Sequence, residues 1–167
     1  MQIITTHLNA DFDCIASMVA AKKLYPDAFL VLSGSCEQQV NEFLKQEKLP
    51  LEFTRIKDVS LEDVELLVVV DTHDPKRIGI FAPLIADPKI EVHIYDHHEN
   101  PSLESKIEKV VLEKRGACTS IFWEILEKKN ISLTREECTL MALGIYQDTR
   151  SLTSSSTTPE DFTAAGN

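Results

Sequence analysis

The sequence predicts a single α/β domain with a doubly wound, mostly parallel sheet and helices on both faces. Short, continuous apolar runs alternate with segments of helical periodicity, a pattern typical of parallel strands that are buried on both sides. The chain has 167 residues, of which 43% are hydrophobic, so it can build one domain with a core but not two ordinary ones. No internal repeat, low-complexity tract or Gly/Ser/Pro-rich linker divides it, and we therefore treat residues 1–167 as one domain.

Four strands are expected, each at an apolar run. The first lies around Ile3 and Ile4, and the second is the run AFLVLS at residues 28–33. The third is LLVVV at residues 66–70, and the fourth is EVHIY at residues 91–95. Because helical segments separate these runs, the strands are expected to be mostly parallel.

Helices are expected between and after these strands. The first follows the segment THLNADFDC, and the second spans residues 36–46. Two more are expected at about residues 117–129 and from Thr134, where Glu137 completes the spacing of a capping box. The buried face of the helix from Thr134 is expected to carry Cys138, Met141, Ala142 and Ile145. A last helix is expected from Pro159, since proline suits the first helical position.

The composition excludes several classes of protein. No segment approaches the roughly 18 apolar residues of a membrane span, and the first residues do not resemble a signal peptide, so a cytoplasmic protein without membrane contact is expected. The net charge of -10 argues against broad binding to polyanions, since that requires a basic surface. The cysteines are widely spaced, and we expect mostly buried, reduced thiols rather than a zinc site. They are Cys14, Cys36, Cys118 and Cys138.

Polar side chains that can bind metal ions follow the first strand. In HLNADFD the side chains of His7, Asn9, Asp11 and Asp13 are two residues apart, so in an extended segment they would point to the same side. Ligand sites in open α/β sheets form at the carboxyl ends of strands, where these residues fall. A simpler alternative is that Asp11 or Asp13 caps the following helix, but a cap does not account for His7.

Titratable residues also follow the third and fourth strands. Asp71 comes directly after LLVVV, where a carboxylate must lie at the sheet edge or be paired. Asp96, His97 and His98 follow EVHIY, and by strand parity His97 points opposite to its two neighbours. His93, inside that strand, is interpreted as a satisfied core or surface residue.

A fourth acidic position, Asp148, comes just after the helix from Thr134. A carboxylate there opposes the partial negative charge of the helix C-terminus, so a cation should compensate for it, although Arg150 could do so without a metal. Histidine and carboxylate ligands without thiolate suit six-coordinate ions such as Mn²⁺ or Mg²⁺. Two such ions about 3.5–4 Å apart would activate a water and bind phosphoryl oxygens, which is the chemistry of phosphate ester hydrolysis.

Four motifs, HLNADFD, VVVDTHD, YDHH and GIYQDT, resemble in order and spacing those of the DHH phosphoesterase family over essentially the whole chain. The resemblance implies a phosphohydrolase that cleaves phosphodiester or phosphomonoester bonds of short nucleic acids or nucleotides. The family also includes exopolyphosphatases and manganese-dependent inorganic pyrophosphatases, and the chain is similar to DHH domains fused to tRNA nucleotidyltransferase modules. Cleavage of pyrophosphate or polyphosphate, and non-hydrolytic binding of metal and nucleotide in such a fusion, stay open as alternatives.

The resemblance also implies a role for each site residue. One metal would be bound by His7, Asp11 and Asp71, and the second by Asp13, Asp71, His97 and Asp148, so that Asp71 bridges both. His98 would contact the scissile phosphate or assist the leaving group, which makes His98 and Asp71 the expected catalytic residues. Asp96 would orient an imidazole. The expected cofactors are two divalent cations, with Mn²⁺ preferred and Mg²⁺ or Co²⁺ as alternatives.

Substrate contacts and partners are also implied. Arg150 follows GIYQDT at a position where family members frequently have glycine, and it is expected to contact the substrate. Family members usually carry a second, smaller domain that closes over the site, and we expect such a domain after Asn167 in the same chain. The expected partners are a phosphorylated small molecule, a nucleotide or a short single-stranded nucleic acid, and the sequence leaves a homo-oligomer open.

Two other pairs of residues receive structural interpretations. Lys114 and Arg115, just before Gly116, are interpreted as a solvated turn. Phe122 and Trp123 lie at helical spacing and are interpreted as core residues rather than as a base-stacking pair. Neither pair is assigned to the site.

Overall fold

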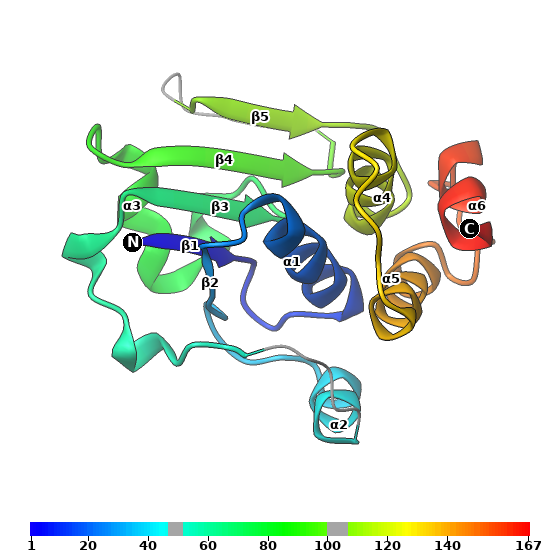
Figure 1. Cartoon of the computed structure of the whole chain (residues 1–167), viewed down its shortest axis with the longest axis horizontal. Helices are drawn as coiled ribbons and strands as arrows, with labels where there is room; N and C mark the ends of the chain where they lie inside the picture. Colours follow the sequence, from blue (N-terminus) through cyan, green and yellow to red (C-terminus); the bar gives the residue numbers. More distant parts are fainter. Residues whose placement is uncertain (47–51, 100–106) are drawn as a thin grey trace.

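The computed structural model describes residues 1–46, 52–99 and 107–167. Five parallel strands form one sheet in the order β2-β1-β3-β4-β5 (Figure 1). The strands are β1 (Gln2–Thr5), β2 (Phe29–Leu30), β3 (Leu66–Val70), β4 (Glu91–Asp96) and β5 (Lys109–Leu112). The α-helices are α1 (Phe12–Leu24), α2 (Gln38–Gln46), α3 (Ala82–Ala86), α4 (Cys118–Lys128), α5 (Arg135–Asp148) and α6 (Pro159–Gly166). Short 3-10 turns lie at Ile56–Asp58, Leu61–Asp63, Pro75–Arg77 and Gly79–Phe81. The prediction of an α/β domain with a parallel, doubly wound sheet is confirmed.

Both faces of the sheet are covered, because alternate residues of each strand point to opposite sides. On one face, residues such as Ile4 and Val68 pack with residues of α1 and α4; in Figure 1, α1 lies in front of the sheet and α4 lies beyond the arrowheads of the strands. On the other face, residues such as Ile3 and Leu67 pack with residues 78–85, which include part of α3. Every residue of β3 is buried, as expected for a strand that is covered on both sides.

Helix α1 is surrounded by the rest of the domain. Residues 13–21 of this helix are all buried. It packs against β1 and β3 on one side and against α4 and α5 on the other. A helix in such a position is apolar all round rather than along one stripe, which explains its composition of small and apolar residues. This packing places the N-terminus of α1 at the carboxyl ends of β1 and β3.

Three elements differ from the sequence prediction. β2 pairs with β1 only through Phe29 and Leu30, although the apolar run spans residues 28–33. β5 is absent from the prediction, because it is an edge strand in which no residue is fully buried and its sequence has only a short apolar run. Helix α3 is also absent from the sequence prediction, because five residues are too few to show helical periodicity.

The predicted capping box of α5 is present. Glu137 Oε2 accepts a hydrogen bond from Thr134 N at 2.8 Å, and Glu137 N donates to Thr134 Oγ1 at 3.3 Å. The predicted buried face of this helix is only partly correct, because Met141 and Ile145 are buried whereas Cys138 is exposed. The buried face consists of Glu137, Leu140, Met141, Gly144 and Ile145, since α1 lies on this side of the helix.

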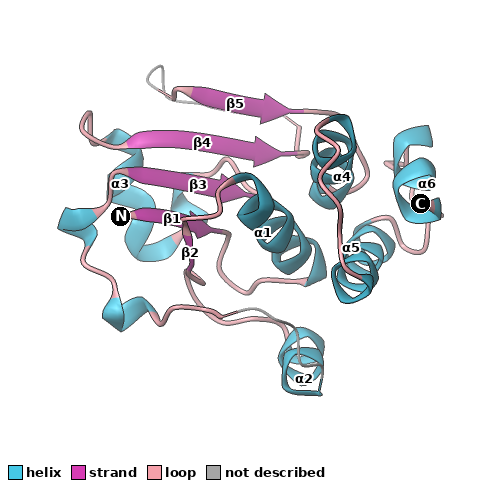
Figure 2. Ribbon diagram, in the orientation of Figure 1, coloured by secondary structure: helices cyan, strands magenta, loops and turns pink. Residues whose placement is uncertain are grey.

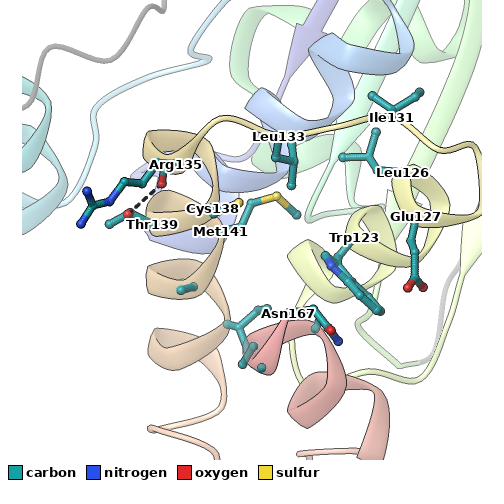
Figure 3. Close-up of a pocket in the computed structure, with 15 residues that line it drawn as sticks. Trp123, Leu126, Glu127, Ile131, Leu133, Arg135, Cys138, Thr139, Met141 and Asn167 are labelled. Atoms are coloured by element: carbon teal, nitrogen blue, oxygen red, sulfur yellow. Dashed lines mark hydrogen bonds between the residues drawn. The ribbon is translucent and has the colours of Figure 1, made fainter.

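An apolar groove of about 610 Å³ lies between α4, α5 and α6 (Figure 3). Trp123 and Met141 are among its lining residues, whereas none of the predicted metal or substrate ligands is. Phe122 is fully buried in the core, as predicted. Trp123 is only partly buried because it lines this groove, so its prediction as a core residue is only partly correct. Within the described ranges, no helix has the length and apolar character needed to cross a membrane.

Candidate metal centre

The loops that follow β1, β3 and β4 meet at one edge of the sheet. The arrowheads of these strands point to the side where α4 lies (Figure 2). The chain moves from β1 outward to β2 and then returns to the other side of β1 with β3, so the strand order reverses between β1 and β3. Such a switch point leaves a crevice at the carboxyl ends of the strands, where open α/β sheets bind ligands.

The segment after β1 brings three predicted ligands to this crevice, but not by the expected geometry. Asn9 has a φ of 57° and is exposed, Asp11 is the N-cap of α1, and Asp13 lies in the first turn of this helix. The prediction that these side chains alternate along an extended segment is therefore wrong. His7, Asp11 and Asp13 converge because the chain turns from strand to helix between them.

The first cluster of candidate ligands contains His7, Asp11, Cys14 and Asp71, with one ligand atom of each within 4.8 Å of the others. His7 Nε2 is 3.6 Å from Asp71 Oδ2. Cys14 Sγ lies 3.0 Å from His7 Nε2 and 3.1 Å from Asp71 Oδ2. Asp11 Oδ1 also accepts a hydrogen bond from Cys14 N at 2.9 Å, so this residue caps α1 and belongs to the cluster as well.

The second cluster contains Asp13, Asp71, His97 and Asp148. His97 Nε2 lies 3.3 Å from Asp71 Oδ1, 3.3 Å from Asp148 Oδ2 and 3.8 Å from Asp13 Oδ2. Asp148 is the last residue of α5 rather than the residue after it. Gly144, one turn earlier, permits the close approach of α5 to α1, because a Cβ at this position would lie only 3.0 Å from Ala16 Cβ.

Asp71 belongs to both clusters, and each of its carboxylate oxygens faces one of them. Oδ2 is directed at His7 and Cys14, and Oδ1 is directed at His97. The residue is 1% exposed and has a φ of 59° directly after β3. A left-handed backbone at a residue other than glycine costs roughly 1–3 kcal/mol and persists where the surrounding structure determines it, commonly at functional sites.

Asp13 connects the second cluster to the start of α4. Its Oδ2 accepts a hydrogen bond from Cys118 N at 2.7 Å, and its Oδ1 accepts one from Thr119 N at 2.8 Å. Helix α4 has no side-chain cap of its own, so a carboxylate from α1 satisfies its first N–H groups and lies at the positive end of its dipole. The position of the Asp13 carboxylate is therefore fixed by two helices.

The imidazoles of both clusters are held through Nδ1, which leaves Nε2 for the site. His7 Nδ1 lies 2.8 Å from the carbonyl oxygen of Leu8, and His97 Nδ1 lies 3.1 Å from the carbonyl oxygen of Arg115. Because a carbonyl oxygen only accepts, each Nδ1 is the donor. Histidines that bind metals are usually held in this way through their second nitrogen.

Asp96 holds two further imidazoles beside the clusters. This residue is fully buried, and its Oδ1 is 2.7 Å from His98 Nδ1 while its Oδ2 is 2.5 Å from His73 Nδ1. Oδ1 also accepts a hydrogen bond from His97 N at 2.8 Å. Both oxygens of Asp96 are therefore occupied by hydrogen bonds, which fits the predicted role of orienting an imidazole better than direct coordination.

Burial and mutual repulsion perturb the charged groups of the second cluster. Burial raises the pKa of Asp13 well above its ordinary value, and the charges of Asp71 and Asp148 raise it further. Burial would also raise the pKa of Asp71, but the neighbouring imidazoles of His7 and His97 hold it below its ordinary value. Burial would lower the pKa of His97, whereas Asp148 and Asp71 raise it to about 12. A divalent cation would relieve this concentration of negative charge.

Two buried atoms of the second cluster lack a hydrogen-bond partner, as expected where a cation would lie between ligands. Asp71 Oδ1 and His97 Nε2 are two of the four side-chain atoms of the described residues that are buried without a hydrogen-bond partner, and they are 3.3 Å apart. An unpaired buried polar atom costs about 1–3 kcal/mol and often indicates an ion or water. The imidazole and carboxylate donors suit a divalent cation. That these side chains bind metal stays a prediction, which the geometry fits.

A pocket beside the second cluster is lined by His97, His98, Asp148, Arg115, Gly116 and Ser156, among others. The His98 side chain is 43% exposed there. The interpretation of Arg115 as part of a solvated turn is wrong, because its side chain is only 17% exposed and its Nε donates to Glu124 Oε1 at 2.7 Å. Lys114 is exposed as predicted.

Arg150, the predicted substrate contact, is not among the residues that line this pocket. It is exposed and has a φ of 50°, and Ser151 and Leu152 after it also have positive φ values. Glycine adopts such a backbone without strain, whereas arginine rarely adopts it. The contact of Arg150 with substrate stays a prediction.

Cys14 and His73 are absent from the sequence prediction of the site. Cys14 lies three residues after Asp11, which places both side chains on one face of the first helical turn. His73 follows Asp71 by two residues within VVVDTHD. By contrast, His93 is satisfied as predicted, since its two nitrogens lie 2.7 Å from the Tyr25 hydroxyl and 2.7 Å from Glu91 Oε1.

Comparisons with known proteins match the fold and the motifs. The profile of the DHH family, N-terminal domain, matches residues 2–145. The A-adding tRNA nucleotidyltransferase of Geobacter sulfurreducens is 49% identical over 166 residues, which cover 99% of this chain and 19% of that protein. A probable manganese-dependent inorganic pyrophosphatase of Lactobacillus gasseri is 25% identical over 96% of this chain and 51% of its own length.

The crystal structure of a putative family II inorganic pyrophosphatase from Methanococcus jannaschii has the same fold. It superposes with a TM-score of 0.81 at 20% identity, covering 99% of this chain and 54% of the other. The chain therefore spans about half the length of the two pyrophosphatases and 19% of the nucleotidyltransferase.

Proposed function

This chain belongs to the DHH family, and on that basis we propose that it is a two-cation phosphohydrolase acting on phosphodiester or phosphomonoester bonds of nucleotides or short single-stranded nucleic acids. The observation that carries the proposal is Asp71, whose two carboxylate oxygens face separate ligand clusters. Two cations that share a carboxylate can act together on one phosphoryl group.

The two clusters would each bind one cation. His7, Asp11 and Asp71 would hold the first, and Asp13, Asp71, His97 and Asp148 would hold the second. When bound, the cations supply an activated water and neutralise charge on the phosphoryl oxygens. Hydrogen bonds to backbone groups fix Asp13, His7 and His97 before any cation arrives, so these ligands need little rearrangement.

His98 is the side chain placed to act on the substrate. It lines the pocket beside the second cluster, and Asp96 holds its Nδ1 at 2.7 Å, while Nε2 has no hydrogen-bond partner among the residues that the structure describes. A free Nε2 can hydrogen-bond the scissile phosphoryl group or give a proton to the leaving oxygen. His98 and Asp71 are therefore the proposed catalytic residues, and His73 would keep Asp96 in place from its other oxygen.

The cations would also supply the positive charge that attracts a phosphorylated substrate. The chain has a net charge of -10, and Arg115 in the pocket is already paired with Glu124. Nucleotides or nucleic acid are favoured over pyrophosphate because the relative with 49% identity is named for its action on tRNA, whereas the pyrophosphatase relative is 25% identical.

A second candidate is a non-hydrolytic module that holds metal and nucleotide for a fused tRNA nucleotidyltransferase. The observation that favours it is the relative named as an A-adding tRNA nucleotidyltransferase. This chain matches 19% of the length of that protein, so the matched region is one part of a larger protein. This candidate predicts binding of Mn²⁺ and nucleotide without turnover.

A substrate panel with Mn²⁺ on the longest natural protein containing this chain tests the proposal. Release of nucleotide or phosphate would be measured with oligoribonucleotides, 3′,5′-bisphosphonucleosides, pyrophosphate and polyphosphate. Asp71→Asn should abolish turnover, and His98→Asn should lower kcat by about 10²–10⁴-fold while Mn²⁺ still binds. Asp58→Asn, at an exposed carboxylate outside both clusters, is the matched control.

Each outcome of the panel has a distinct meaning. Undiminished activity in Asp71→Asn would refute the two-cation assignment. Binding of metal and nucleotide without turnover of any substrate would favour the second candidate. Turnover confined to pyrophosphate or polyphosphate would leave the chemistry intact and overturn the proposed substrate class.

A further inference from the structure

Cys14 places a buried thiol inside the first cluster. Its side chain comes from the first turn of α1 and is 0% exposed. The sulfur lies 3.0 Å from His7 Nε2 and 3.1 Å from Asp71 Oδ2, while these two atoms are 3.6 Å apart. The three atoms form a small triangle, and Asp11 contributes a fourth ligand atom within 4.8 Å.

The two sides of this triangle that include the sulfur match the spacing of a sulfur ligand and a nitrogen or oxygen ligand around one metal ion. A zinc ion lies about 2.3 Å from a thiolate sulfur and about 2.0–2.1 Å from an imidazole nitrogen. Two such ligands are therefore about 3.1 Å apart at a right angle and about 3.6 Å apart at the tetrahedral angle. The two separations that involve the sulfur, 3.0 Å to His7 Nε2 and 3.1 Å to Asp71 Oδ2, lie at the right-angle end of this range, and His7 Nε2 and Asp71 Oδ2 are 3.6 Å apart.

Packing alone does not account for this position of the sulfur. Cys14 contacts the core beneath α1, where a thiol can act as a small apolar side chain. The thiol donates a hydrogen bond to Asp71 Oδ2, but its single proton accounts for one of the two polar contacts and not for the other, with His7 Nε2. Cys118 shows the contrast, because it is another buried thiol whose Sγ lies 3.4 Å from the Tyr95 carbonyl oxygen and which is in none of the candidate metal clusters of the described residues.

We propose that Cys14 is a thiolate ligand of the first cation and makes the two cation sites differ in metal preference. This inference rests on the two-cation centre of the proposed function. The first site would offer nitrogen, oxygen and sulfur, whereas the second offers only nitrogen and oxygen. Thiolate favours Zn²⁺ or Co²⁺ over Mn²⁺ or Mg²⁺, and the second set accepts Mn²⁺. The thiol proton passes to the solvent as the metal–sulfur bond forms, and no oxidation state changes.

This inference revises the expectation from the sequence that both sites prefer Mn²⁺. That expectation rests on histidine and carboxylate ligands without thiolate, because the four cysteines are expected to be mostly buried, reduced thiols. The structure places its sulfur among the ligand atoms of one site and not of the other. A protein with one soft and one hard site would hold two different cations when both are available.

Titration of the metal-free protein with Co²⁺ tests the proposal. All samples carry Cys138→Ser, because Cys138 is an exposed thiol that can bind cobalt itself. We expect a near-ultraviolet sulfur-to-cobalt charge-transfer band that saturates at one cobalt per chain. Cys14→Ser and Cys14→Ala should lose this band while cobalt still binds at the second site, and both should lower the preference for Zn²⁺ over Mn²⁺ by at least about tenfold. The matched control, Cys118→Ser, should keep the band.

X-ray absorption of the zinc-loaded protein gives a second readout that needs no change at Cys14. One sulfur neighbour at about 2.3 Å from the zinc is expected. Binding of two cobalt ions without the charge-transfer band, or zinc without a sulfur neighbour, would overturn the role of Cys14 and leave the proposed function intact. Failure of cobalt, zinc and manganese to bind at all would overturn both.

Discussion

Gly144 controls how closely α5 approaches α1, and its replacement by alanine should disturb the second cluster more than it disturbs the fold. A Cβ at this position would lie 2.8 Å from Thr119 Oγ1, 3.0 Å from Ala16 Cβ and 3.1 Å from Asp13 Cα. The last of these atoms belongs to the backbone of α1, so a rotation of a side chain cannot relieve the contact. We therefore expect α5 to move away from α1.

The size of this movement follows from the contact distances. Carbon atoms in ordinary contact are about 3.5–4.0 Å apart, so Gly144→Ala requires a shift of roughly 0.4–1 Å. Overpacking costs about 1–3 kcal/mol, and the better helix propensity of alanine returns about 1 kcal/mol, so the net loss of stability should be about 0–2 kcal/mol. Asp148 lies one helical turn later and would move with the helix. Misplacement of a site group by about 1 Å can lower a rate by about 10²-fold.

Calorimetric titration with Mn²⁺ and thermal unfolding separate these two effects. Gly144→Ala should bind Mn²⁺ more weakly at the second site and turn over more slowly, while its unfolding temperature changes by a few degrees. Gly166→Ala in α6 is the matched control, because nothing lies within 4 Å of a Cβ there. Wild-type Mn²⁺ affinity in Gly144→Ala would refute the argument that the close contact positions Asp148.

Three further predictions concern protonation, capping and the second imidazole on Asp96. Asp148 and Asp71 raise the pKa of His97 to about 12 against the effect of burial, so the imidazole holds a proton that the cation must displace. Mn²⁺ affinity should therefore fall by up to about tenfold for each unit by which the pH is lowered, above neutrality as well as below it. If Mn²⁺ binding releases a proton, the binding enthalpy measured by calorimetry should vary with the ionisation enthalpy of the buffer. Equal binding enthalpies in all buffers would contradict proton release. Thr134→Ala removes the capping box of α5 and should lower the free energy of unfolding by about 1 kcal/mol, as measured by denaturant unfolding. The Mn²⁺ affinity should not change. An unchanged denaturation midpoint would count against the stabilising role of the cap. His73→Ala removes the imidazole that lies against Asp96 Oδ2. It should lower kcat by about 10–100-fold while Mn²⁺ still binds. A wild-type kcat would show that His73 does not position Asp96.

Local features of the sequence were sufficient for most of the fold. The run LLVVV predicts the bounds of β3, because a parallel strand that is covered on both faces must be apolar at every position. The spacing of Thr134 and Glu137 predicts the start of α5, because a capping box involves only residues within one turn. β5 escaped prediction, because the half-exposed residues of an edge strand do not produce a long apolar run.

The sequence also determined which residue types gather at the carboxyl ends of the strands, since Asp71 and the residues from Asp96 to His98 come directly after β3 and β4. Only the tertiary structure decided how they meet. The carboxylate of Asp13 accepts a hydrogen bond from Cys118, 105 residues away, and the sulfur of Cys14 lies beside Asp71, 57 residues away. These contacts depend on the packing of α1 against β3, α4 and α5, which places side chains from distant segments within a few ångströms of one another. Local periodicity carries no information about such distances, so the thiol in the first cluster became visible only in the folded chain.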